Sequence, residues 1–183
     1  MTDKKKMQIV RFFEAHCRDC NEVFAVPLLS DFAYGEFILP SEDGQAFAYL
    51  NAITESSFDL ISNLVQEINE KENSGVPREN LGFMGTILDK LKRENGAKHS
   101  LTSRDLNRLH WVVAQCADEI DDKKLSNQYR CPKCRSGDID YGAAIVVRDD
   151  EIPIASFERF RTLSETEQKG RVRELYNSSE GLF

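Results

Sequence analysis

The sequence lacks any long apolar stretch. None approaches the roughly 18 consecutive apolar residues of a membrane-spanning helix, and the lysines at positions 4–6 are not followed by the apolar segment of a signal peptide. We therefore expect a cytoplasmic protein without a membrane segment. Hydrophobic residues make up 40% and charged residues 30% of the 183 residues, and this balance excludes the collagen-like and disordered classes.

The common catalytic motifs are also missing. The chain has no Gly-rich phosphate loop, no H-E-x-x-H and no G-x-S-x-G, and it contains only three histidines. One concentrated polar cluster falls on an expected helix, and it consists of Arg104, Asp105, Arg108 and His110. Its pattern is that of an exposed helix face rather than an active site. We therefore expect that the protein is not an enzyme.

Basic residues are fewer than acidic ones. The chain has 24 Lys and Arg against 31 Asp and Glu, a net charge of −7, which argues against a general nucleic-acid coat protein. Two acidic runs, residues 118–122 and 149–151, are candidate contacts for a basic partner. A solvated surface is the other explanation of the first run.

Cysteine is sparse, but its spacing is informative. Four of the five cysteines form two Cys-x-x-Cys pairs, Cys17/Cys20 and Cys131/Cys134. Two residues between thiolates allow one tight turn to point both sulfurs at the same ion, and two such turns supply the four-sulfur tetrahedral shell that zinc prefers. The sequence therefore predicts one structural zinc ion bound by all four.

The flanking residues fit such turns. Asn21 follows the first pair and tolerates the left-handed backbone conformation in which these turns tend to end, and residues 136–137 (Ser-Gly) are expected to provide the same freedom after the second pair. Residues 7–14 and 22–28 predict a hairpin around the first pair. Strands before and after the second pair predict another hairpin there.

The sequence disfavours three other uses of the cysteines. A disulfide framework is disfavoured by the missing secretion signal and the odd number of cysteines. A redox pair would stand at the start of a helix, whereas strand-like residues follow both pairs. A rubredoxin-type iron site has glycine after its second knuckle, where this chain has Arg135.

The two pairs and their flanks resemble the zinc-ribbon superfamily, in which two hairpin-borne knuckles clamp one structural zinc ion. The pattern that starts at Cys131, CPKCRSGDI, is a common form of the second knuckle. One departure is large, because 110 residues separate Cys20 from Cys131. The resemblance implies a fold element and a metal, and it implies no activity.

Periodicity predicts helices between the two pairs. A helix is expected from Ser56, a weaker one over residues 77–95, and a third from Thr102 into the acidic run at residues 118–122. The fifth cysteine, Cys116, lies in the apolar stripe of the third helix, so we expect a buried thiol. A short helix follows, and a final helix is expected to begin at Ser164, which forms a capping box with Glu167.

These elements predict an α+β fold. A small antiparallel zinc ribbon, residues 1–53 and 126–154, is interrupted by a helical insertion, residues 54–125, and is followed by a C-terminal helical segment, residues 155–183. Within the ribbon, residues 149–153 are expected to form a linker. The sequence does not specify an oligomeric state.

The expected function is that of a non-enzymatic, zinc-stabilised protein-interaction module. An acidic immunity protein, an antitoxin or a regulatory adaptor with a basic partner would be concrete versions, by analogy alone.

The alternative is a nucleic-acid-binding zinc-ribbon protein. Residues 126–148 carry four cations against two carboxylates, a local charge of +2, and Tyr129 and Tyr141 are candidates to stack on bases. The candidate contacts for nucleic acid or another partner are Arg18, Arg130, Lys133 and Arg135. The simpler explanation is that these cations offset the charge of the thiolates.

Overall fold

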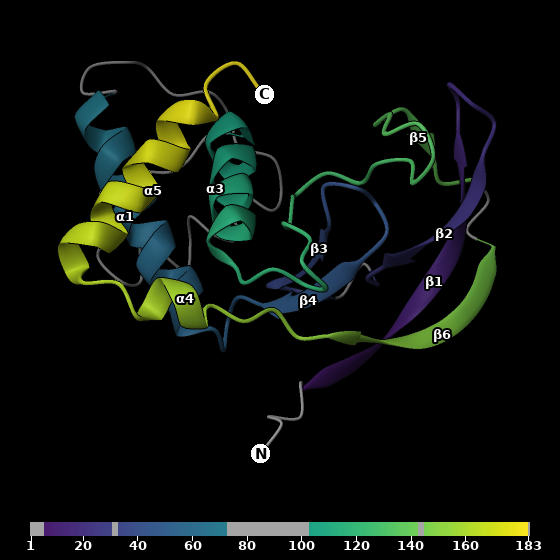
Figure 1. Cartoon of the computed structure of the whole chain (residues 1–183), viewed down its shortest axis with the longest axis horizontal. Helices are drawn as coiled ribbons and strands as arrows, with labels where there is room; N and C mark the ends of the chain where they lie inside the picture. The colour runs from purple at the N-terminus through teal and green to yellow at the C-terminus, as the bar shows by residue number, and fades with distance from the viewer. Residues whose placement is uncertain (1–5, 31–32, 73–102, 143–144, 183) are drawn as a thin grey trace.

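The computed structural model describes residues 6–30, 33–72, 103–142 and 145–182. It shows the predicted α+β fold, with a group of helices at one end and a long antiparallel sheet at the other (Figure 1). None of the helices in these four ranges is both long enough and apolar enough to cross a membrane. The predicted helix over residues 77–95 lies outside the described residues.

The central strand of the long sheet is β1 (Met7–Cys17). On one side it pairs with β2 (Val23–Leu28), which confirms the predicted first hairpin. On its other side lie β6 (Val146–Pro153) and, nearer the cysteines, β5 (Ile139–Asp140). Both strands pair antiparallel with the same side of β1, at different positions along it. Together they form one interrupted strand beside β1.

This topology corrects two predictions. The second cysteine pair has no hairpin of its own, because β5 and β6 both pair with β1. Residues 149–153 are not a linker either, since they form most of β6 and pair with residues 7–11. Both errors have one cause, because alternation within a segment does not reveal which distant strand it will pair with.

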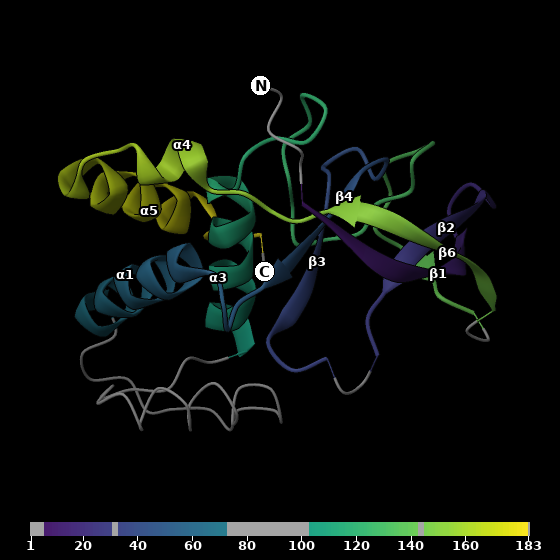
Figure 2. The ribbon, with the colours of Figure 1, turned by 90° about the horizontal axis from the view of Figure 1, so that it is seen from below.

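A second hairpin lies between the helices and the long sheet in both views (Figures 1 and 2). It consists of β3 (Glu36–Pro40) and β4 (Phe47–Asn51). Side chains alternate between the two faces of a strand. Leu39, Ala48 and Leu50 therefore join the helical core, whereas Ile38, Phe47 and Tyr49 pack with Val10, Phe12 and Ile152 of the long sheet. The predicted domain boundaries stay a prediction.

Three helices enclose the larger core: α1 (Ser56–Glu72), α3 (Ser103–Cys116) and α5 (Glu165–Ser178). The apolar positions that predicted α1 are all buried, namely Phe58, Ile61, Leu64, Val65 and Ile68. At the start of α5, the Ser164 hydroxyl accepts the N–H of Glu167 and the Glu167 carboxylate accepts the N–H of Ser164, which is the predicted capping box.

The third helix is shorter than predicted. It ends at Cys116, so the acidic run at residues 118–122 lies beyond it. The Asp118 carboxylate accepts the Ser156 hydroxyl at 2.5 Å and the N–H of Glu158 at 2.8 Å, and it thereby caps the short helix α4 (Glu158–Arg161). Burial acts to raise the pKa of Asp118, but these hydrogen bonds outweigh it and the pKa is lowered.

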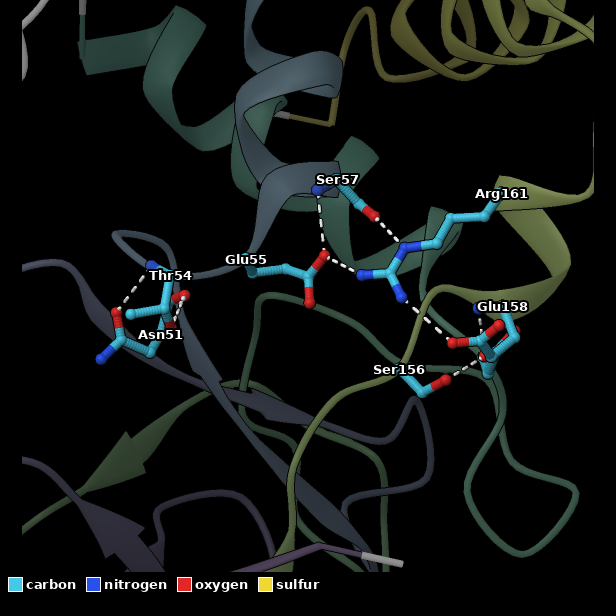
Figure 3. A network of polar contacts seen from close by, with 8 residues as sticks. Asn51, Thr54, Glu55, Ser57, Ser156, Glu158 and Arg161 are labelled. Carbon is cyan, nitrogen blue, oxygen red and sulfur yellow. Dashed lines mark hydrogen bonds and ion pairs between the residues drawn. The ribbon is translucent and has the colours of Figure 1, made fainter. Parts of the chain in front are cut away.

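A polar network joins α4 to the start of α1 (Figure 3). Arg161 donates to the hydroxyl of Ser57 at 3.0 Å, forms an ion pair with Glu55, and bonds Glu158 within its own helix at 3.0 Å. The Glu55 carboxylate also accepts the N–H of Ser57 at 2.9 Å and so caps α1. One guanidinium therefore connects the two helix starts.

The polar cluster on α3 is not an exposed face. Arg104 is exposed, but Asp105 and Arg108 are each only 7% exposed. Arg108 donates to the Ser179 hydroxyl at 2.9 Å and to the Tyr176 carbonyl at 2.7 Å, and its guanidinium lies 3.4 Å from the centre of the Tyr176 ring. The prediction failed because α5 covers this side of α3, a contact that the local pattern does not contain.

Candidate metal centre

The structure brings the four predicted ligands together. The sulfurs of Cys17, Cys20, Cys131 and Cys134 all lie within 4.8 Å of one another. Two distances run between the pairs: 3.4 Å from Cys17 to Cys134 and 3.6 Å from Cys20 to Cys131. A Zn–S distance of about 2.3 Å implies about 3.8 Å between the sulfurs of a tetrahedron. The four sulfurs therefore fit one metal ion, and this donor set is the one that zinc prefers.

The first turn closes through its own backbone. The N–H of Asn21 donates to the carbonyl of Cys17, and the N–H of Cys17 donates to the carbonyl of Glu22, both at 2.9 Å. Asn21 has a φ of +57°, as predicted. Asparagine is one of the few residues that occupies this region without a large cost.

The second turn repeats the first. The N–H of Arg135 donates to the carbonyl of Cys131 at 2.9 Å, and the N–H of Cys131 donates to the carbonyl of Ser136 at 2.8 Å. Arg135, not Gly137, takes the left-handed conformation, with a φ of +65°. The prediction pointed to Ser136 and Gly137 because glycine adopts a positive φ at little cost. The turn instead requires the positive φ at Arg135, one residue after its second cysteine.

The hydrogen bonds of the turn also favour a thiolate. Burial acts to raise the pKa of the Cys131 thiol, but the N–H groups of Cys134 and Lys133 lower it to about 7. At Cys20, the N–H of Glu22 acts to lower the pKa, but burial and the three neighbouring thiols raise it to about 12. Four thiolates repel one another at this distance, so a divalent cation is needed to keep all four deprotonated.

The β3–β4 turn supports the second knuckle, and the sequence did not reveal this. Gly44, with a φ of +70°, lies so close to the chain that a Cβ atom on it would stand 2.1 Å from the Arg130 carbonyl oxygen. The Asp43 carboxylate lies 3.2 Å from Lys123 Nζ and 3.9 Å from Arg135. The sequence shows that Gly44 belongs to a turn. It does not show that this turn contacts Arg130, because Arg130 lies more than 80 residues away along the chain.

Asp43 is held as a carboxylate. Burial acts to raise its pKa, but hydrogen bonds from Ser41 and the N–H of Gln45, together with Lys123, lower it. Ser41 is fully buried and its hydroxyl donates to Asp43 at 2.5 Å. The Asp43 carboxylate therefore lies between Lys123, which precedes the second cysteine pair, and Arg135 of the metal-binding knuckle.

The four candidate contact residues have partners within the chain. Arg18 pairs with Asp140 at 3.4 Å and Asp138 at 3.7 Å, and Lys133 pairs with Glu22 at 2.9 Å. Arg130 donates to the carbonyl of Arg135 at 3.2 Å.

The charge around the knuckles is therefore balanced locally. A zinc ion with four thiolates adds −2, which offsets the +2 that residues 126–148 carry. This balance favours the simpler explanation of these cations, and the contact role of Arg18, Arg130, Lys133 and Arg135 stays a prediction.

The two tyrosines near the second pair differ in their surroundings. Tyr129 donates its hydroxyl to the Pro27 carbonyl at 2.5 Å, and its ring lies 6.0 Å from the rings of both Phe47 and Tyr141. Tyr129 is therefore part of the fold and not a free stacking surface. Tyr141 is 38% exposed.

The fifth cysteine and one of the three histidines, His110, lie on α3. Cys116 is 7% exposed, as predicted, and burial raises the pKa of its thiol to about 12. The His110 ring lies 4.5 Å from the ring of Phe37, and burial lowers its pKa to about 4. The thiol is thus a poor nucleophile and the imidazole is neutral.

Comparison of this chain with protein-family models, curated proteins and solved structures finds no match. The cysteine cluster fits a zinc-binding motif, and membership of the zinc-ribbon superfamily is not shown by any match. The function is therefore inferred from the geometry of the site itself.

Proposed function

We propose that Cys17, Cys20, Cys131 and Cys134 bind one structural zinc ion, and that the protein is a non-enzymatic protein-interaction module stabilised by it. The supporting observation is the pair of matching turns, which direct four sulfurs to a single point. Four thiolates fill the tetrahedral shell of zinc and leave no position for a water or a substrate. A structural role follows from this closed shell.

The role of the ion is to connect distant parts of the chain. The 110 residues between Cys20 and Cys131 form a loop whose closure costs conformational entropy. Metal binding offsets this cost, because the site forms only when the two segments meet. The β5 strand begins five residues after Cys134 and is only two residues long. The ion therefore also helps to fix the register between β5 and β1.

The proposed interaction surface is one face of the β1–β6 pair. Ile9 is 65% exposed and Val146 is 51% exposed. Ile9 lies opposite Glu151 and Val146 lies opposite Phe13, so the strand register places all four on the same face. Val147 and Ile145 beside them are also about half exposed. The Arg11–Asp149 ion pair lies on the same face between Ile9 and Val146. The surface therefore combines this ion pair with exposed apolar side chains, which are typical of protein contact sites.

The acidic run in β6, residues 149–151, offers less free negative charge to a basic partner than its composition suggests. Asp149 pairs with Arg11 and Asp150 pairs with Arg148, both at 3.1 Å. The N–H of Glu151 is taken by the Asp150 carboxylate at 2.9 Å, and Pro153 has no N–H. Such features protect a strand edge from pairing with another strand. We therefore place the contact on this face of the β1–β6 pair rather than on the edge.

Two measurements test the proposal. Elemental analysis of the purified protein should give one zinc per chain, and a Cys131→Ser, Cys134→Ser variant should lose it. Zinc-loaded protein is then used to isolate partners from its native lysate after nuclease treatment. The captured protein should disappear with Ile9→Lys, Val146→Lys and remain with Lys133→Glu, Arg135→Glu.

The opposite pattern would favour the nucleic-acid alternative. Capture that is abolished by nuclease, weakened steeply by salt and lost with Lys133→Glu, Arg135→Glu would contradict a protein-interaction module. A zinc content of zero in protein purified without chelator would contradict the structural ion.

A further inference from the structure

A cavity of about 370 Å³ lies between the carboxyl end of α3 and the helices α4 and α5. It shares no residue with the cysteine cluster. The floor is apolar, with Cys116, Leu125 and Phe160 buried and Ala117 and Leu163 half-buried. A volume of this size lies in the usual range for small-molecule sites in proteins, about 300–1,000 Å³.

The rim of the cavity is cationic. Three basic side chains, Lys124, Arg159 and Arg171, and one carboxylate, Glu119, line it. Together they carry a charge of +2 in a chain whose net charge is −7. An apolar floor with a few charged groups that converge on its rim is the usual construction of a ligand site.

Contacts within the protein account for part of this charge. Arg159 lies 3.7 Å from Glu119, and Arg171 lies 3.3 Å from Glu174 outside the cavity. The carboxyl end of α3 carries about half a negative charge, and its last turn contains no basic residue. No ion pair of Lys124 is present among residues 6–30, 33–72, 103–142 and 145–182. Within the described part of the chain, the three cations on the rim therefore outnumber their two carboxylate partners, Glu119 and Glu174.

We infer that this cavity binds a small anion with an apolar body, such as a carboxylate on a medium-length aliphatic chain. The chain would lie on Cys116, Leu125 and Phe160, and the carboxylate would lie between Lys124 and Arg171. Binding is non-covalent, because burial keeps the Cys116 thiol protonated. This inference is independent of the zinc ion and of the protein partner.

Titration of the full, zinc-loaded chain with octanoate tests the inference. The backbone amide signals of Ala117 and Leu163 in a ¹⁵N-correlation spectrum should shift with saturation. The neutral alcohol 1-octanol, which has the same chain length, should bind at least about fivefold more weakly. An absence of saturable shifts at these residues would overturn the inference, as would equal affinity for the acid and the alcohol.

Variants test the cationic rim and the apolar floor of the cavity separately. Lys124→Gln, Arg171→Gln should weaken octanoate binding about fivefold and leave 1-octanol binding unchanged. Ala117→Phe, which fills the cavity, should abolish both. Arg173→Gln on the same helix is the matched control and should change neither. Lys124, Arg171 and Arg173 are exposed, so variants at these positions are expected to fold. Thermal melting checks this. An equal loss with Arg173→Gln would show non-specific attraction and overturn the inference.

Discussion

The carbonyl oxygen of Arg130 lies 2.1 Å from the position that a Cβ atom on Gly44 would occupy. Gly44 belongs to the β3–β4 turn, and Arg130 directly precedes the first cysteine of the second pair. Only glycine allows this approach, and its φ of +70° is also one that other residues rarely adopt. The β3–β4 hairpin and the metal-binding knuckle therefore stand in direct backbone contact.

Gly44→Ala should destabilise the protein strongly. The added methyl group must displace the knuckle backbone, and alanine is strained at this φ. We expect a loss of about 2–4 kcal/mol in the free energy of unfolding, measured by urea denaturation of zinc-loaded protein. Gly170→Ala is the control, because a Cβ atom there meets nothing within 4 Å in the interior of α5. It should stabilise by about 0.5–1 kcal/mol, and equal effects of the two changes would contradict the close approach.

Removal of the metal should loosen the whole molecule. We expect Cys131→Ser, Cys134→Ser to lower the melting temperature by about 10 °C or more, because the ion closes the 110-residue loop. A chelator should have the same effect on the unchanged protein. Cys116→Ala is the control, since it removes the cysteine outside the cluster and should leave one zinc per chain. An unchanged melting temperature in the double variant would refute a structural role.

Arg135→Gly should stabilise the second knuckle. Arginine is strained at the φ of +65° that this position adopts, and its ion pair with Asp43, at 3.9 Å, is long and exposed. Relief of that strain should add about 1 kcal/mol to the free energy of unfolding. The same change at Asn21, where φ is +57°, should add less because asparagine tolerates this region. Destabilisation by Arg135→Gly would show that the side chain itself supports the site.

Arg108→Met should weaken the attachment of α5. The change removes the buried donor to the Ser179 hydroxyl and one of the donors to the Tyr176 carbonyl, which still accepts the Ser179 hydroxyl at 2.6 Å. We expect a cost of about 1–3 kcal/mol. Hydrogen exchange should become faster in the last turn of α5. Arg104→Met on the exposed side of the same helix should change stability by less than about 0.5 kcal/mol. Similar costs for both would mean that the Arg108 contacts contribute nothing beyond helix propensity.

The stability of the protein should fall on mild acidification because of His110. Burial lowers the pKa of this imidazole from 6.5 to about 4, so the unfolded chain binds a proton that the folded chain does not. The stabilising effect is complete above pH 6.5 and is lost as the pH falls toward 4. Between pH 7.5 and 5.5 we expect a loss of about 1 kcal/mol.

His110→Leu should remove this slope, as measured by urea denaturation at a series of pH values above those that release zinc. His16→Gln, at a residue that is exposed, should retain the slope. A slope that persists in the His110→Leu variant would assign it to other groups.

The local signals in the sequence were reliable where one segment decides the outcome. The spacing of apolar residues fixed α1, and Ser164 and Glu167 marked the start of α5. The Cys-x-x-Cys spacing and Asn21 indicated the first turn in full. In each case the determining contacts lie within a few residues of one another.

The predictions that failed depend on neighbours that are distant in sequence. Asp105 and Arg108 read as an exposed face because nothing near them indicates that α5 covers them. Residues 149–153 read as a linker because Asp149 gains its partner, Arg11, only after β6 lies against β1. Charged residues in a strand are recognisable only once their partners are known.

The sequence alone determined the α+β class, the main helices and the four cysteines that meet, because periodicity and ligand spacing are local properties of a chain. Only the tertiary structure decided that β5 and β6 share one side of β1, that Gly44 rests on the second knuckle, and that a cationic cavity forms between α3 and α5. These features arise from contacts between segments far apart in sequence. Their energies depend on shape and burial, which no single segment specifies.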